Sequence, residues 1–91
     1  MEQVRTYLAS IGVPARVTST VRSRAEQERL YAGRAHNRYP VARPGTSAHE
    51  RGLAFDISAP EWALTMAGLM APTWGLRWSA ADPVHFQAAD A

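Results

Sequence analysis

The run LAFDIS at residues 53–58 constrains the fold most, because its apolar side chains alternate with polar or small ones. Successive side chains of a strand point to opposite faces, so Leu53, Phe55 and Ile57 share one face. The other face carries Asp56 between two small residues. We therefore expect a strand that packs its apolar face inward and presents a carboxylate on the opposite side.

The remaining segments predict an alternation of helices and strands. Ser23 and Glu26 form a capping-box pattern at the start of a second helix. A third helix has Pro60 at a favoured first position, and Pro72 marks its end. Residues 34–47 predict a loop that is long for so small a chain, and such loops are usually functional or disordered. The mixed order indicates an α+β fold, with a small, mostly antiparallel sheet and flanking helices. The predicted helices cover residues 2–11, 24–33 and 60–71, and the predicted strands cover residues 15–20, 53–58, 75–78 and 84–87.

Composition excludes several classes of protein. We expect the 91 residues to form one domain, 1–91, and the absence of cysteine excludes disulfides and thiolate metal sites. The net charge is only +2, and the ten basic residues are arginines scattered along the chain, which argues against a nucleic-acid partner. No segment approaches the ~20 apolar residues of a membrane span, and the first residues lack a signal-peptide pattern. We expect a protein made in the cytoplasm with no membrane partner.

Two pairs of histidine and aspartate carry the candidate chemistry. His49 lies upstream of Asp56, with Gly52 between them to permit a bend, and Asp82 lies shortly before His85. A catalytic zinc takes three protein ligands and keeps one position open, so two histidines and one aspartate would suffice and one acid would remain for proton transfer. Each pair alone is as well explained by an ordinary core or surface histidine and a solvent-facing carboxylate. Only the two pairs together therefore indicate a catalytic zinc site.

Three blocks of the sequence resemble those of the zinc D-alanyl-D-alanine peptidases. SAHERGLAFDI is similar to the signature S-x-H-x-x-G-x-A-x-D, and GLRWSAADPVHFQ is similar to a Trp followed by D/E-x-x-H-F. STVRSRAEQERLY resembles S-G-x-R-S-x-x-x-Q, with Thr20 in place of the common glycine. The family includes VanY- and VanX-type carboxypeptidases and dipeptidases and the phage L-alanyl-D-glutamate endolysins, and has the hedgehog/D-Ala-D-Ala peptidase zinc fold. The blocks occur in the family's order and cover residues 19–87.

The resemblance implies zinc as cofactor and a role for each matching residue. The implied zinc ligands are His49, Asp56 and His85. Asp82 would be the catalytic base, and Arg22 would stabilise the charge that develops on a substrate oxygen. The implied substrate contacts are Arg22, Gln27 and Ser47. Without the block match, Arg22 and Gln27 would be interpreted as part of a solvated helix face. His36 is expected at the surface.

These roles predict a zinc metallopeptidase that cleaves peptidoglycan stem peptides. By the same resemblance, an aspartate base is typical of the endolysins, which favours an L-alanyl-D-glutamate endopeptidase over a D-alanyl-D-alanine carboxypeptidase. A protein without a leader that acts on the cell wall also suggests release by a bacteriophage or carriage in a virion. The alternatives are a non-catalytic zinc or peptide-binding domain and, from the high pI alone, a nucleic-acid-binding protein. We expect a monomer.

Overall fold

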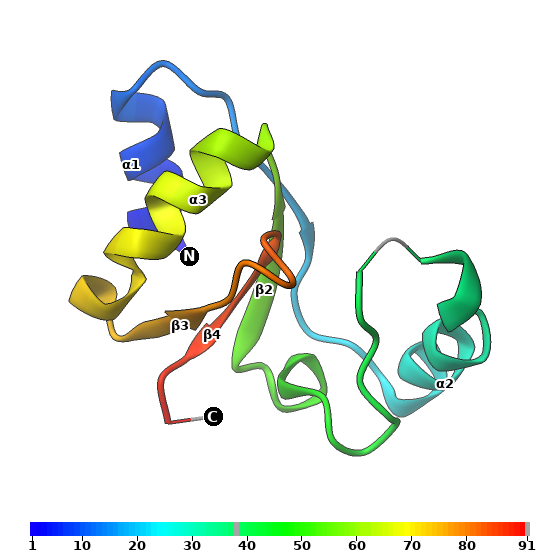
Figure 1. Cartoon of the computed structure of the whole chain (residues 1–91). Helices are drawn as coiled ribbons and strands as arrows, with labels where there is room; N and C mark the ends of the chain where they lie inside the picture. Colours follow the sequence, from blue (N-terminus) through cyan, green and yellow to red (C-terminus); the bar gives the residue numbers. More distant parts are fainter. Residues whose placement is uncertain (38, 91) are drawn as a thin grey trace.

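The computed structural model describes residues 1–37 and 39–90, and it shows helices alternating with strands of one antiparallel sheet (Figure 1). The sheet has four strands in the order β1-β2-β4-β3, and each neighbouring pair is antiparallel. This confirms the predicted α+β class. The helices are α1 (Glu2–Ser10), α2 (Arg24–Ala32) and α3 (Glu61–Met70), the strands are β1 (Arg16–Ser19), β2 (Ala54–Ser58), β3 (Leu76–Trp78) and β4 (His85–Ala88), and the 3-10 turns are η1 (Arg34–His36), η2 (Ala48–Arg51) and η3 (Ala71–Trp74).

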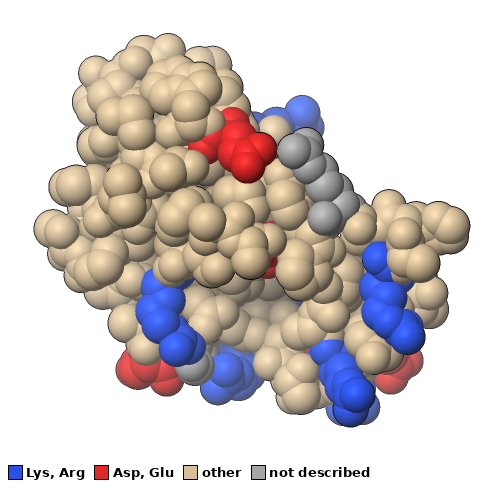
Figure 2. All heavy atoms as spheres, in the orientation of Figure 1, with Lys and Arg blue, Asp and Glu red and all other residues tan. Residues whose placement is uncertain are grey.

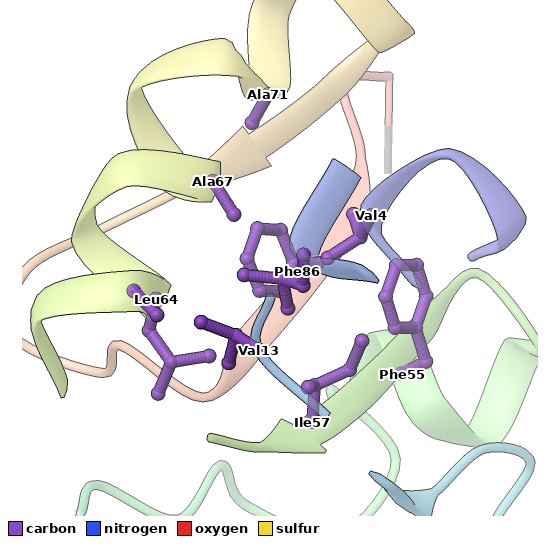
Figure 3. Packing of buried hydrophobic residues seen from close by; sticks show 10 residues of the cluster. Val4, Val13, Phe55, Ile57, Leu64, Ala67, Ala71 and Phe86 are labelled. Carbon is purple, nitrogen blue, oxygen red and sulfur yellow. The ribbon is translucent and has the colours of Figure 1, made fainter. Parts of the chain in front are cut away.

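The hydrophobic core lies between the sheet and the helices α1 and α3. Phe55 of β2 and Phe86 of β4 are direct cross-strand partners, and their rings stack with centroids 5.6 Å apart. Val4 of α1 and Leu64 of α3 close over the same face of the sheet, where they and Phe86 are almost completely buried (Figure 3). Helix α2 and the loop that follows it lie on the other side of the sheet (Figure 1). One face of the sheet is therefore packed, and the other is left for a site.

The predicted capping box at the start of α2 is present. The Ser23 hydroxyl accepts a hydrogen bond from the Glu26 backbone N–H, and the Glu26 carboxylate accepts one from the Ser23 N–H. Together these bonds satisfy two backbone donors that have no partner inside the helix. The cap fixes where α2 begins, and it sets the position of Gln27, the buried residue of this helix.

Three details differ from the prediction. Leu53 precedes β2 and is 39 % exposed, so it does not belong to the core face with Phe55 and Ile57. Pro60 is the N-cap of α3 rather than its first helical residue. The α-helix ends before Pro72, because a proline has no N–H to donate to the preceding turn, and the chain continues as the 3-10 turn η3. Within the described part of the chain, each helix is too short or too polar to cross a bilayer.

Candidate metal centre

Strands β2 and β4 place Asp56 and His85 side by side. The two residues are direct partners in the antiparallel register, so their side chains project from the same face of the sheet. Their neighbours Phe55 and Phe86 form the next pair and point to the core, as the alternation of LAFDIS predicts. A one-residue slip in this register would exchange the carboxylate with a phenylalanine.

His49 reaches the same place from η2, a turn that the sequence did not predict. The Ser47 hydroxyl caps this turn by accepting a hydrogen bond from the His49 N–H. Gly52 ends the turn with a φ of 70°, in the left-handed region that favours glycine. The chain then reverses, and the Leu53 N–H donates to the Ala48 carbonyl as β2 begins. The predicted bend at Gly52 is confirmed, and it holds the His49 ring over the polar face of β2.

One atom from each of the three side chains converges on a common point. His49 Nε2 lies 3.0 Å from Asp56 Oδ1 and 3.2 Å from His85 Nδ1, and the last two atoms are 3.2 Å apart. A tetrahedral zinc with bonds of about 2.0 Å keeps its ligand atoms roughly 3.3 Å apart. The spacing of these three atoms therefore suits one zinc ion with an open fourth position.

Hydrogen bonds on the far side of each ring fix which nitrogen faces the common point. His49 Nδ1 is 2.7 Å from the Thr20 carbonyl, which can only accept, so the ring proton is on Nδ1 and the Nε2 lone pair faces the site. His85 Nε2 lies 2.8 Å from the Gln87 amide oxygen. Metal-ligating histidines usually donate their second N–H in this way. Three lone pairs at a separation of 3.0–3.2 Å call for a cation or a proton between them.

The ionisation of the site agrees with that geometry. Burial raises the pKa of Asp56, but the adjacent His49 and His85 rings and the charge of Arg22 lower it by more, so it lies well below its usual range. Burial lowers the pKa of His85, but its hydrogen bonds to Asp56 and Gln87 raise it by more, and the net shift is upward. Asp56 is therefore a carboxylate at neutral pH and favours positive charge beside it.

Asp82 lies on the turn before β4 and lines the same pocket as the three converging side chains. Its carbonyl accepts the His85 N–H at 3.0 Å, which ties the turn to the start of the strand. Burial raises the pKa of Asp82, an effect that the nearby charge of His85 opposes and the charge of Asp56 reinforces, and the net shift is upward. A carboxylate with a raised pKa is a better proton acceptor than an exposed one, which suits the predicted role of a base.

The predicted substrate contacts separate into two kinds. Arg22 and Ser47 line the pocket, whereas Gln27 is completely buried and does not. Gln27 accepts a hydrogen bond from Arg22 at 3.1 Å and donates to the Ala42 carbonyl at 2.8 Å. Gln27 has no exposed surface in this structure, and its substrate contact stays a prediction from the sequence. Gln27 joins the arginine to the loop that forms the opposite wall.

Arg22 is bonded to the metal site itself, a contact that the sequence did not reveal. Its Nη2 is 2.9 Å from Asp56 Oδ2, and its Nε donates to the Ser19 hydroxyl at 3.0 Å. With the bond to Gln27, three of its five N–H groups are engaged, and among the described residues the other two have no hydrogen-bond partner. The arginine therefore orients Asp56 and still contributes positive charge to the pocket.

The pocket has a volume of about 560 Å³ and lies between the polar face of the sheet and α2 with its following loop. Figure 2 shows arginines spread over the face in view rather than gathered in one patch. This distribution suits the expectation that the chain has no nucleic-acid partner, which stays a prediction. His36 is exposed on η1, as expected.

Comparison with known proteins gives the family. The model for VanY, D-alanyl-D-alanine carboxypeptidase, matches residues 1–86, whereas none of the curated proteins matches. VanYB in complex with D-alanine-D-alanine has a TM-score of 0.76 at 21% identity, over 96% of this chain and 66% of that one. The LdcB LD-carboxypeptidase has a TM-score of 0.74 at 25% identity, over 96% of this chain and 60% of that one. The Serratia marcescens L-Ala D-Glu endopeptidase ChiX has a TM-score of 0.59 at 21% identity, over 96% of this chain and 77% of that one.

These likenesses agree with the site. One of the matching structures is a VanY variant in complex with Zn(II), the ion that the three converging side chains fit. The chain spans between 60% and 67% of the length of the first three solved chains that it matches. With a family model that matches nearly its whole length, the chain belongs to the VanY D-alanyl-D-alanine carboxypeptidase family.

Proposed function

We propose that this protein is a zinc-dependent peptidase that cleaves peptidoglycan stem peptides. The observation that carries the proposal is the convergence of His49, Asp56 and His85 at 3.0–3.2 Å on the wall of a pocket that also holds Asp82. Three ligands and one unbound acid are what a catalytic zinc site needs, whereas a structural zinc fills its fourth position with protein. This difference favours an enzyme over a non-catalytic zinc or peptide-binding domain.

Each polar residue of the pocket has a separate role in the proposed reaction. Bound zinc would supply Lewis acidity and lower the pKa of a water molecule to about 7. Asp82 takes the proton from the attacking water and returns it to the amine of the leaving group. The two remaining N–H groups of Arg22 donate to the substrate carbonyl oxygen, where negative charge develops. Ser47 lies in the same pocket and offers its hydroxyl to the substrate backbone.

Two peptide bonds are candidates for cleavage. Release of the terminal D-alanine is the first, because the matching family model is a D-alanyl-D-alanine carboxypeptidase. VanYB in complex with D-alanine-D-alanine and the LdcB LD-carboxypeptidase also share the fold, at TM-scores of 0.76 and 0.74. The L-alanyl-D-glutamate bond is the second, because Asp82 provides an aspartate where the resemblance links aspartate to endolysins. The likeness to the endopeptidase is weaker, with a TM-score of 0.59.

Digestion of defined substrates tests both the activity and the bond. Zinc-loaded protein is incubated with a synthetic stem pentapeptide and with purified peptidoglycan, and the products are identified by mass spectrometry. Free D-alanine supports the carboxypeptidase, and new D-glutamyl amino termini support the endopeptidase. The chelated protein and Asp82→Asn serve as controls. If the zinc-loaded protein binds the pentapeptide without cleaving it, the enzyme proposal is wrong and the binding-domain alternative takes its place.

The setting of the activity is also a proposal. A peptidase with this substrate acts on the cell wall, and the expectations that a bacteriophage delivers it and that it works as a monomer stay predictions from the sequence. Neither the family nor the pocket depends on them.

A further inference from the structure

We infer that Gln87 is a positioning residue, which holds His85 in the one tautomer that can bind a metal. The inference rests on the proposed zinc site and concerns a residue to which the sequence blocks assign no role. Gln87 follows His85 by two positions on β4, so the two side chains share the polar face of the sheet. The amide oxygen of Gln87 lies 2.8 Å from His85 Nε2.

The chemistry of the two partners leaves a single arrangement for this hydrogen bond. A carbonyl oxygen can only accept, so His85 Nε2 must carry the proton. A neutral imidazole has one ring proton, which leaves His85 Nδ1 with its lone pair free. This Nδ1 is the atom that lies 3.2 Å from both His49 Nε2 and Asp56 Oδ1.

The site itself favours the opposite tautomer. His49 Nε2 and Asp56 Oδ1 are both acceptors, and both face His85 Nδ1. In the metal-free protein they therefore favour a proton on Nδ1, the atom that a metal needs. Gln87 opposes them by stabilising the proton on Nε2. Without Gln87 the metal would first have to displace a proton that the site holds.

The backbone around Gln87 is held on both sides. Its strand is central in the sheet, and Gln87 is paired with Ala54 of β2 on one edge and with Arg77 of β3 on the other. Replacement of its side chain should therefore leave the strand in place. His49 offers no equivalent test. Its ring donates to the backbone carbonyl of Thr20, which no substitution removes.

Two substitutions at this position separate hydrogen bonding from packing. Gln87→Leu removes the acceptor, and Gln87→Glu restores one as a carboxylate. Gln3→Leu, the same change at an exposed position of α1, is the matched control. Zinc affinity is measured by competition with a chromophoric chelator. The tautomer of His85 is read from two-dimensional ¹⁵N–¹H correlations of the imidazole ring in the metal-free protein, at a pH at which the ring is neutral.

We expect Gln87→Leu to bind zinc about 10- to 100-fold more weakly than the wild type, the usual effect of losing such a partner. Its His85 signals should shift toward the Nδ1–H form, whereas the wild type shows Nε2–H. Gln87→Glu should retain both the affinity and the wild-type tautomer, and Gln3→Leu should match the wild type. Far-UV circular dichroism of the metal-free variants verifies that the fold is unchanged.

Wild-type zinc affinity together with an Nε2–H tautomer in Gln87→Leu would overturn the inference. So would Gln87→Glu behaving like Gln87→Leu, because loss of packing would then explain both. Neither readout uses peptide cleavage, so the inference can fail while the proposed enzyme stands. Conversely, a wild-type protein that binds zinc and shows the Nε2–H tautomer but cleaves no stem peptide contradicts only the proposed function.

Discussion

Asp56 is held through both of its carboxylate oxygens. Oδ2 accepts from Arg22 at 2.9 Å, while Oδ1 faces the two histidine nitrogens. The sequence predicted which side chains gather here, because their spacing and the family blocks are visible in it. It did not predict the Thr20 carbonyl that orients His49, because a backbone acceptor leaves no trace in residue type. Gln87 could have been found from the alternation of β4, since it shares a face with His85.

Asp82 should be needed for turnover and not for metal binding. Asp82→Asn keeps the size of the side chain but removes the proton acceptor, so we expect kcat to fall by about 10²- to 10⁴-fold. Zinc content, measured by elemental analysis, should equal that of the wild type, because Asp82 is not among the three converging groups. Loss of zinc from the variant would instead make Asp82 a ligand, and full activity would remove it from the mechanism.

The metal-free protein should lose stability as the pH rises above neutrality. The hydrogen bonds of His85 hold its pKa above the ordinary value of 6.5 in the folded state. The protonated ring therefore stabilises the folded state fully below pH 6.5, and this stabilisation is lost as the pH rises through the higher pKa of the folded state. Asp56 contributes at acid pH instead. Because its pKa is lowered in the folded state, its carboxylate stabilises the fold above about pH 4, and this stabilisation is lost as the pH falls further.

Urea titrations of the chelated protein between pH 6 and pH 9 measure the first effect. The free energy of unfolding should decline over this range in the wild type, and the decline should be much smaller in His85→Gln. His36→Gln, which alters an exposed histidine of η1, should keep the wild-type slope. An equal slope in His85→Gln would assign the pH dependence to another group.

At the scale of whole elements, helix α3 packs against the strand that holds the turn carrying Asp82. Gly68 of α3 is buried against the ring of Trp78 on β3, and a Cβ atom there would overlap the ring. The Trp78 indole N–H donates to the Pro83 carbonyl at 2.8 Å, in the turn between Asp82 and His85. From the sequence, Gly68 is only a weak position in a predicted helix. Its real constraint is a contact with a residue ten positions away in another element.

Gly68→Ala should therefore destabilise the protein, although alanine is the better helix former by about 1 kcal/mol. Overpacking of this kind usually costs about 1–3 kcal/mol, and displacement of Trp78 should also lower kcat by moving the turn. Thermal unfolding and steady-state kinetics measure the two effects. Gly33→Ala is the matched control, because its φ is negative and its new Cβ would make only an ordinary contact at 3.6 Å. A Gly68→Ala protein more stable than the wild type would refute the packing argument.

At the scale of the molecule, the pocket lies between two parts of the chain. The sheet with α1 and α3 forms one wall, and α2 with its loop forms the other (Figure 1). Arg22 connects them, because it donates to Asp56 of β2 on one side and to Gln27 of α2 on the other. The sequence predicted the element types and their order, because periodicity and caps are local signals. It did not predict the strand order β1-β2-β4-β3, which depends on how a core of only ten buried apolar side chains packs.

With so small a core, a bound metal should contribute much of the stability. The three converging side chains come from η2, β2 and β4, so one bound ion would link segments that are far apart in sequence. An ion that binds only the folded state adds about 4 kcal/mol when its free concentration is roughly 1,000 times its Kd. For a chain of this size, each kcal/mol corresponds to roughly 4–8 °C in Tm. Multiplying the stabilisation by the shift in Tm per kcal/mol, we expect EDTA to lower the Tm by more than about ten degrees.

Differential scanning calorimetry of the zinc-loaded, chelated and zinc-restored protein measures this shift. Zinc should restore the Tm, whereas magnesium should not, because magnesium prefers octahedral oxygen coordination to a site with two imidazoles. His49→Ala supplies the matched control, since its Tm should be low and insensitive to either ion. A wild-type Tm that EDTA leaves unchanged would mean that the metal does not link these segments, and the convergence of His49, Asp56 and His85 would then need another cause.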